Sequence, residues 1–156
     1  VFSLRSIAWW ERNDLPCKVT VMGEDLSAQP DRRNETHDGC GAEPRGGSKR
    51  AVPAEDFQLD KPITGLRACI RNDRLKGIEI EQSSVSVVDG EIRVNREPHE
   101  EDFVATQPNC DEGDFEWTDF VRCPAGKVAV GLRLHVADGQ KPRAVKGLTL
   151  LCRGFL

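Results

Sequence analysis

Apolar and polar residues alternate along the segment from Lys127 to Val136, KVAVGLRLHV. Successive side chains of a β-strand point to opposite faces, so this period of two predicts a strand with one apolar face. The alternation resumes at Leu148, Leu150 and Cys152, after the turn-rich residues 137–142. We therefore predict an antiparallel hairpin over residues 127–152.

Parts of this hairpin recur in residues 61–80. Gly65-Leu66-Arg67 and Gly131-Leu132-Arg133 both follow a lysine at the same spacing. Further along, Lys76-Gly77-Ile78 corresponds to Lys146-Gly147-Leu148. Two matches in the same order indicate that one supersecondary unit is repeated.

The N-terminus carries a third version of the pattern. Ser3-Leu4-Arg5 takes the place of Gly-Leu-Arg, and Val19-Thr20-Val21 corresponds to Ile78-Glu79-Ile80. We predict three related units within a single all-β domain spanning residues 1–156. The units cover about residues 1–23, 57–82 and 117–152.

The segments between these units have different patterns. Residues 24–56 contain almost no apolar residues and are expected to form a long polar loop. Ser84 to Val94 reads as a further hairpin around Asp89-Gly90, because both positions accept a positive φ. No segment has a helical period with caps, which leaves the chain nearly all β.

Composition narrows the possible partners. With 156 residues the chain is long enough for one buried core, and its net charge of −4 argues against a general nucleic-acid binder. No apolar run approaches the length of a membrane span, so we predict no membrane-spanning segment. The chain starts at Val1 without a signal peptide, and we expect this to be a processed or trimmed N-terminus.

The six cysteines are dispersed and form no CxxC pair, which favours three disulfides in an oxidising compartment over a zinc site. Cys123 and Cys152 flank the third unit and are expected to pair. The other four cysteines allow three pairings, of which we predict Cys69–Cys110 and Cys17–Cys40, with the remaining combinations open.

Asn34-Glu35-Thr36 is an acceptor sequon for N-glycosylation. Together with the cysteines, the predicted glycan on Asn34 indicates a protein that is secreted into the extracellular space.

Residues 117–152 also follow a recognisable order: an aromatic pair, Cys-Pro-x-Gly, an Ala-Val-Gly strand, a small residue, Gly-hydrophobic-x-Leu and a cysteine. The residues are Trp117, Phe120, Cys123-Pro124-Ala125-Gly126, Ala129-Val130-Gly131, Ala144, Gly147-Leu148-Thr149-Leu150 and Cys152. This order resembles the repeat of the vitelline membrane outer layer protein family. The resemblance implies a β-prism, three sheets around an axis, in a secreted coat protein that binds sugar chains. A β-trefoil or a β-sandwich is the alternative fold.

The sequence gives little evidence of a catalytic site. The three histidines are His37, His99 and His135, and no motif joins one of them to a nucleophile and an orienting group. We assign no catalytic residue, metal ligand or cofactor. Residues 97–116 are rich in Asp and Glu. For this acidic segment, a calcium site at Asp111, Asp114 and Glu116 remains an open alternative.

The expected hairpin tips carry residues that favour turns, and their amide and carboxylate groups also hydrogen-bond sugar hydroxyls. Trp9 and Trp10 lie beside the first tip, and adjacent strand residues point opposite ways, so one is expected in the core and the other exposed. The predicted ligand-binding residues are Trp9, Trp10, Asn13, Asp14, Asn72, Asp73 and Asp138.

These observations predict a non-catalytic extracellular coat, matrix or lectin-like protein that binds glycans or protein partners. The alternative is a structural subunit that assembles into an extracellular polymer, as a homo-oligomer or hetero-oligomer, through exposed strand edges. A secreted hydrolase ranks third.

Overall fold

The computed structural model describes residues 2–12, 15–25, 31–41, 49–52, 61–89, 91–95, 103–105, 116–139 and 143–154. Every regular element within these ranges is a β-strand, and the strand pairs are antiparallel, which confirms the all-β prediction. No helix that could cross a membrane was found in this part of the chain.

The first sheet has four strands. They are β1 (Phe2–Arg12), β2 (Leu15–Asp25), β3 (Arg32–Asp38) and β4 (Lys49–Val52). Their spatial order is β3-β2-β1-β4, so the chain makes three successive strands and then returns to pair beside the first. This connection is a Greek key, and its first two strands form the predicted N-terminal hairpin.

The second sheet repeats that order. Its strands are β5 (Ile63–Arg71), β6 (Arg74–Gln82), β9 (Phe103–Ala105), β10 (Glu116–Trp117) and β11 (Val121–Arg122). β9 pairs with β6, and both β10 and β11 pair with β5. The second sheet therefore has the same spatial strand order as the first, with β10 and β11 in the position that β4 occupies, although β7 and β8 lie between β6 and β9 in the chain.

Two further hairpins complete the described structure. β12 (Lys127–Val136) and β13 (Val145–Gly154) form the third long hairpin, as predicted from the alternating pattern. β7 (Ser84–Val88) and β8 (Glu91–Asn95) form the short hairpin predicted around Asp89. Within the ranges given above, neither β12 nor β13 has an additional strand at its outer edge.

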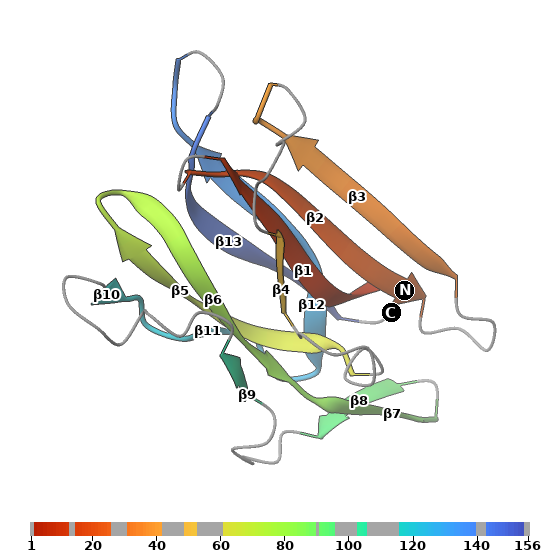
Figure 1. The fold of residues 1–156 in the computed structure, drawn as a ribbon. Helices are drawn as coiled ribbons and strands as arrows, with labels where there is room; N and C mark the ends of the chain where they lie inside the picture. The colour runs from red at the N-terminus through yellow and green to blue at the C-terminus, as the bar shows by residue number, and fades with distance from the viewer. Residues whose placement is uncertain are drawn as a thin grey trace.

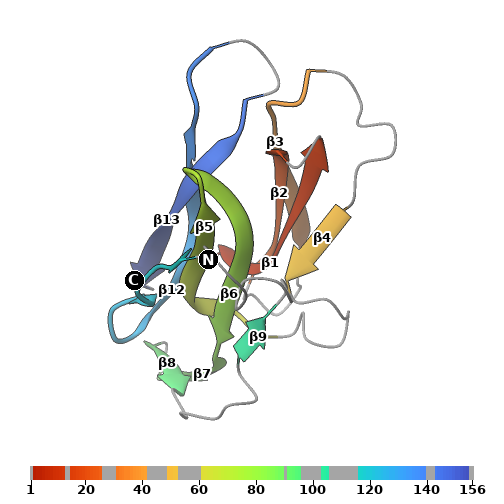
Figure 2. The same cartoon turned by 60° about the vertical axis from the view of Figure 1, so that its left-hand side comes forward.

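The three long hairpins contact one another in every combination. Figures 1 and 2 show them arranged around a common interior, with the short hairpin β7–β8 at one end. The core takes residues from each: Leu4, Ile7 and Trp9; Ile63, Leu66, Leu75, Ile78 and Ile80; Ala129, Val145 and Leu150. A threefold prism stays a prediction, as does the single domain built from a repeated unit.

The three long hairpins share two irregularities. In the first strand of each, the register shifts between Leu4 and Ser6, between Ile63 and Gly65, and between Ala129 and Gly131. A second shift follows in each hairpin, after Trp10, Cys69 and His135 respectively, and there the extra residue belongs to the second strand. These shifts align Ser6 with Gly65 and Gly131, so the sequence alignment that placed Ser3 there was wrong by three residues. The alignment of Val19-Thr20-Val21 with Ile78-Glu79-Ile80 agrees with the registers.

The misalignment has a physical cause. A bulge adds one residue to a strand, so the residues that face the core change from even to odd positions as the chain passes it. In β1, Leu4 faces the core before the bulge, and Ile7 and Trp9 do so after it. The apolar pattern of β1 therefore does not continue in a single phase.

The long polar loop expected over residues 24–56 was also partly wrong, because β3 and β4 lie within it. All residues of β3 are exposed. With neither face buried, the strand carries no apolar alternation that a sequence pattern could reveal.

Two of the predicted disulfides are present, Cys17–Cys40 and Cys123–Cys152. Cys69 is disulfide-bonded too, and its predicted partner Cys110 lies outside the described residues. Disulfides are compatible with an extracellular protein.

Candidate functional site

The strand ends that lead into the tips of the long hairpins lie toward the same end of the molecule (Figures 1 and 2). At the β5–β6 tip, Asn72 and Asp73 have φ values of 50° and 56° and connect Arg71 to Arg74. Positive φ at both central residues defines a type I′ turn, which matches the twist of a hairpin. Asn72 and Asp73 are exposed at this turn.

Asp138 is exposed just beyond the end of β12, and Gly139 follows it with a φ of 111°. Arg143 Nε donates a hydrogen bond to the Gly139 carbonyl oxygen over 2.9 Å, which holds the two sides of this tip together. Asn13 and Asp14, at the tip of the first hairpin, lie outside the described residues. The structure therefore places three of the five predicted tip residues, Asn72, Asp73 and Asp138, on two separate hairpin tips.

A covalent link ties the first sheet together beside the third tip. Cys40, just after β3, is bonded to Cys17 on β2. Gly39 N donates to the Cys17 carbonyl oxygen, and Arg143 N donates to the Gly39 carbonyl oxygen, both at 2.8 Å. The segment around Gly39 thus connects β2 directly to the β12–β13 tip.

The two adjacent tryptophans separate as strand geometry requires. Trp9 is fully buried in the core between the sheets. Trp10 points the other way and is partly exposed on the outer face of the first sheet, the face turned away from the core. Trp9 is therefore too buried to contact a ligand, and Trp10 is the tryptophan that remains a candidate ligand-binding residue.

Polar side chains from two neighbouring strands accompany Trp10. Trp10 is paired with Lys18 in the β-ladder, and Lys18 in turn with Asp38, so the three side chains share one face. Lys18 Nζ lies 5.0 Å from the centre of the Trp10 ring, within the range of a cation–π contact. Beside this row the hydroxyls of Thr20 and Thr36 are hydrogen-bonded at 2.8 Å. We call Trp10, Lys18, Thr20, Thr36 and Asp38 the Trp10 face.

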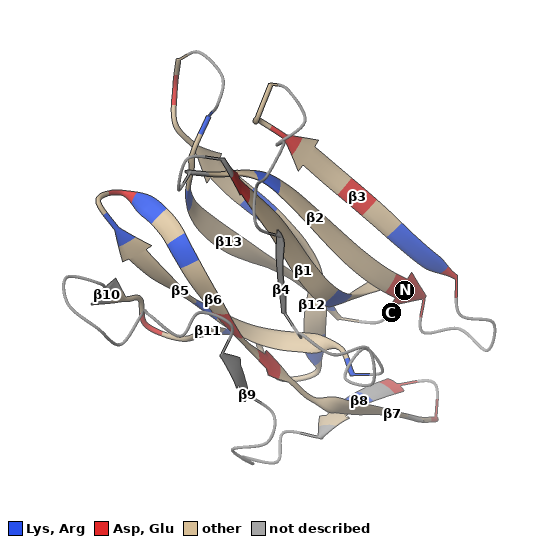
Figure 3. Ribbon diagram, viewed as in Figure 1, with Lys and Arg blue, Asp and Glu red and all other residues tan. Residues whose placement is uncertain are grey.

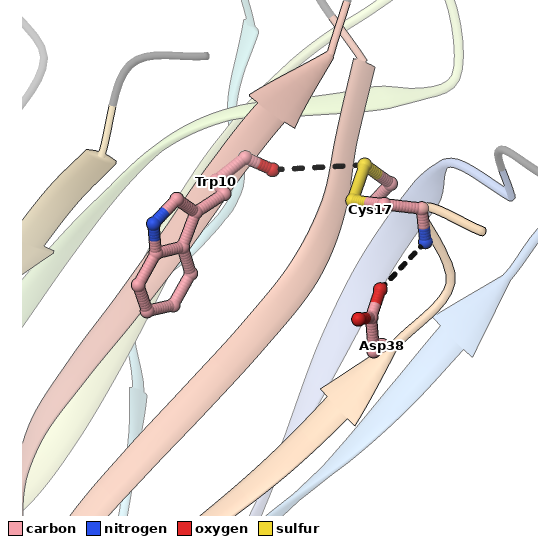
Figure 4. Close-up of a disulfide and its surroundings, with 4 residues drawn as sticks. Trp10, Cys17 and Asp38 are labelled. Atoms are coloured by element: carbon pink, nitrogen blue, oxygen red, sulfur yellow. Dashed lines mark hydrogen bonds between the residues drawn. A yellow bond between two sulfur atoms is a disulfide. The ribbon is translucent and has the colours of Figure 1, made fainter. Parts of the chain in front are cut away.

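The Cys17–Cys40 disulfide supports one end of the Trp10 face (Figure 4). Asp38 Oδ1 accepts a hydrogen bond from the Cys40 backbone N–H at 2.9 Å, which fixes the Asp38 carboxylate. Cys17 Sγ lies 3.9 Å from the Trp10 carbonyl oxygen. A disulfide sulfur carries no proton, so this second approach is a packing contact, and it places the disulfide directly behind the backbone of Trp10.

A second cluster of aromatic and charged residues covers the outer face of β5 and β6. Arg67 Nη2 donates to Glu79 Oε2 at 2.7 Å, and Arg122 Nε donates to Glu81 Oε2 at 2.7 Å. The Arg67 guanidinium also lies 4.5 Å from the Trp117 ring centre, and that of Arg122 lies 4.8 Å from the Phe120 ring centre. The repeated Gly-Leu-Arg motif marks Arg67 in the sequence, but no residue pattern predicts its contacts with Glu79 and Trp117.

The segment that carries these aromatic residues is bound to β5 through its backbone. Thr118 N donates to the Ala68 carbonyl oxygen at 2.8 Å, and Thr118 Oγ1 accepts from Ala68 N at 3.0 Å. Gly65 leaves room for the Phe120 ring, since a Cβ atom there would stand only 2.9 Å from Phe120 Cε1. We call residues 116–122 the covering segment.

Two grooves follow the sides of the third hairpin. The first, with a volume of about 330 Å³, lies between β12 and the inner faces of β2 and β3. Its lining residues from β12 are Leu132, Leu134 and Val136. Val19 and Val21 line it from β2, and Glu35 and His37 from β3. The second groove, of about 400 Å³, separates β13 from β5 and the covering segment.

His135 stands beside the second groove, and its Nε2 lies 2.7 Å from Thr149 Oγ1. A histidine–hydroxyl pair of this kind needs a further group to orient the ring before it resembles a catalytic unit. Both residues are exposed, and no such orienting group contacts His135 among the residues that the structure describes.

Charged residues of both signs occur along the described strands. Figure 3 shows basic and acidic residues interspersed along the strands of the first two sheets. No group of three or more potential metal ligands was found in the described ranges. Asp111 and Asp114, which the calcium alternative requires, lie outside those ranges.

Comparison with known proteins does not add to this picture. No protein-family model matches the chain, and searches of curated proteins and of solved structures found no significant match.

Proposed function

We propose that the protein is a secreted, non-catalytic coat or lectin-like protein of the vitelline membrane outer layer type that binds glycans on the Trp10 face. The observation that carries the proposal is the partly exposed Trp10 ring, fixed on the outer face of the first sheet beside Lys18. An aromatic ring offers an apolar surface to the C–H face of a sugar, and neighbouring polar groups bind its hydroxyls.

The surroundings of Trp10 supply both kinds of hydrogen-bonding group. Lys18 is a donor, and the Asp38 carboxylate is an acceptor whose position is fixed by the Cys40 N–H. The Thr20 and Thr36 hydroxyls can donate and accept. The Cys40 N–H and the Thr20–Thr36 hydrogen bond already order Asp38 and the two threonines, so little side-chain entropy is lost at these three residues when a sugar binds.

The test is glycan-array binding of the intact protein and of two variants. Trp10→Ala should abolish binding, and Lys146→Ala should leave it unchanged, since Lys146 is an exposed lysine on the third hairpin. Both variants should keep the melting temperature within a few degrees of the parent protein. Equal binding by Trp10→Ala and the parent protein would refute the proposal.

A second candidate function is assembly of copies through strand edges. The free outer edges of β3 and β12, within the described ranges, favour it, because unpaired edge strands can pair with another chain. Size-exclusion chromatography with light scattering separates the two candidates. Large assemblies that form without sugar and survive Trp10→Ala favour assembly, whereas a monomer that binds the array favours glycan recognition.

A further inference from the structure

The first strands of the second and third hairpins carry the same motif but differ in what covers it. The register shifts align Gly65-Leu66-Arg67 of β5 with Gly131-Leu132-Arg133 of β12. In the second sheet the covering segment packs on this motif from the outside. Phe120 fills the space over Gly65, and Trp117 stacks on Arg67.

The corresponding surface of the third hairpin is open. A Cβ atom on Gly131 would have Leu151 as its nearest neighbour, at 3.5 Å. Leu151 itself is 38% exposed. Arg133 is exposed, and no aromatic ring of the described residues stacks on it. The motif is therefore present on β12 without the aromatic cover that it receives on β5.

Among the described residues, no strand pairs with the adjacent edge of β12 either. β1 and β5 each have a further strand paired with them at corresponding residues. Val52 of β4 pairs with Ile7 of β1, and Val121 of β11 pairs with Leu66 of β5. Leu132 is the residue of β12 that corresponds to Ile7 and Leu66, and within the described ranges it pairs only with Leu150 of β13. The groove of about 330 Å³, to which β12 contributes apolar side chains and β3 contributes Glu35 and His37, extends along this same side of β12.

From these relationships we infer that the outer edge of β12 is a binding site for an extended peptide segment of a partner protein, with two aromatic residues spaced as Trp117 and Phe120 are. The peptide pairs antiparallel with β12. Its aromatic side chains cover Gly131 and stack on Arg133, and its alternate side chains enter the groove beside Leu132 and Leu134. This inference does not rest on the Trp10 face or on glycan binding.

One difference between the two surfaces specifies the ligand further. Glu81 is the cross-strand partner of Gly65, and it binds Arg122 of the covering segment. The cross-strand partner of Gly131 is Leu151. A peptide that suits β12 must therefore carry an apolar residue where the covering segment carries Arg122.

The experiment uses two synthetic peptides that differ at this position. One, EWTDFVR, copies the covering segment, and the other, EWTDFVL, replaces its arginine by leucine. A third peptide, EATDAVL, lacks both aromatic residues. Binding of fluorescein-labelled peptides to the full chain is measured by anisotropy, and hydrogen–deuterium exchange locates the protected amides.

The intact protein should bind EWTDFVL roughly tenfold more tightly than either other peptide, with protection of amides in β12. The variant Leu151→Glu introduces the residue type that Glu81 provides in the second sheet. Its peptide preference should reverse in favour of EWTDFVR. Arg133→Ala should weaken EWTDFVL roughly fivefold through the lost cation–π contact, whereas Arg153→Ala, at another exposed arginine, should not.

Three outcomes overturn the inference. One is equal affinity for EWTDFVL and EATDAVL, or no binding of EWTDFVL at millimolar concentration. Another is an unchanged peptide preference in Leu151→Glu. The third is a dimer in the absence of peptide whose β12 amides are already protected, since the occupant of the edge would then be a second copy of the chain.

Discussion

Gly65 lies directly beneath the Phe120 ring, so the second sheet can be covered only because this residue has no side chain. Glu81 Cβ and Arg122 Cγ would also stand within 3.1 Å and 3.3 Å of an added Cβ. Gly131 holds the same place in β12 without such neighbours. The space around each glycine therefore differs: other side chains fill it at Gly65, where the sheet is covered, and leave it freer at Gly131.

We predict opposite effects of the same substitution at these two positions. Gly65→Ala should lower the free energy of unfolding by about 1–3 kcal/mol, because the Phe120 ring and its neighbours must move apart. Gly131→Ala should leave it unchanged or raise it by up to about 1 kcal/mol, because alanine loses less conformational entropy in a strand. Urea denaturation of both variants measures the difference. Similar losses at both positions would contradict the open surface of β12.

The Arg67–Glu79 ion pair should contribute measurably to stability. The Glu79 side chain is only 12% exposed, and Arg67 is also held against Trp117. Removal of the arginine leaves a nearly buried carboxylate without its partner, so Arg67→Ala should cost about 2–3 kcal/mol. Arg133→Ala is the matched control at the aligned position, and since Arg133 is exposed it should change stability by less than about 0.5 kcal/mol.

A double variant separates the charge effect from lost packing. Arg67→Met combined with Glu79→Leu removes both charges and keeps apolar volume, and it should recover much of the loss seen in Arg67→Ala. Chemical denaturation in parallel with the single variants gives the coupling energy. No recovery in the double variant would assign the loss to packing against Trp117 instead.

The tryptophans should differ sharply in their effect on stability. Trp9 is fully buried, so Trp9→Ala should cost about 3–5 kcal/mol, whereas Trp10→Ala on the outer face should cost about 1 kcal/mol or less. Trp9 Nε1 is buried without a hydrogen-bond partner among the described residues. Trp9→Phe removes that buried N–H and retains an aromatic ring, so it should cost much less than Trp9→Ala. Thermal melting of the three variants checks this order.

Asn34 should be modified when the chain passes through a eukaryotic secretory pathway. Its backbone is in β3, and the residue is exposed. We expect protein secreted from cultured eukaryotic cells to lose mass on treatment with an N-glycosidase, and Asn34→Gln to abolish that loss without changing the melting temperature. An identical mass before and after digestion would show that the sequon is not used.

The alternation of apolar and polar residues predicted those strands in which one face is buried and the other is exposed to solvent. This condition holds for β13 and for β12 after its bulge at Ala129–Gly131, and the prediction of that hairpin was correct. It fails for β3, where both faces are exposed, and it fails at the bulge after Leu4, where the phase of the alternation changes. A search for alternation with a period of two detects neither a strand with two exposed faces nor a bulge.

The candidate site was predictable only in part, for a related reason. Strand geometry required that Trp9 and Trp10 point to opposite faces, but only packing decides which of them meets the core. The neighbours of Trp10 come from β2 and β3, and Asp38 is distant from it in sequence. The covering of Gly65 and Arg67 by residues 116–122 is likewise a long-range contact, although the repeated Gly-Leu-Arg motif marked the surface on which it forms.

The third hairpin has the least backbone pairing of the three, with two strands in the described structure, yet both neighbouring sheets are fastened to it. Cys123 is bonded covalently to Cys152 of β13, and its N–H donates to the Thr64 carbonyl oxygen of β5. On the other side, Arg143 N donates to Gly39, next to the Cys17–Cys40 bridge. Reduction of Cys123–Cys152 should therefore loosen the seam between the second sheet and the third hairpin, because Cys17–Cys40 lies within the first sheet. The β12–β13 hairpin would detach as a unit while the two larger sheets keep their hydrogen bonds, so redox conditions would control the order in which the molecule unfolds.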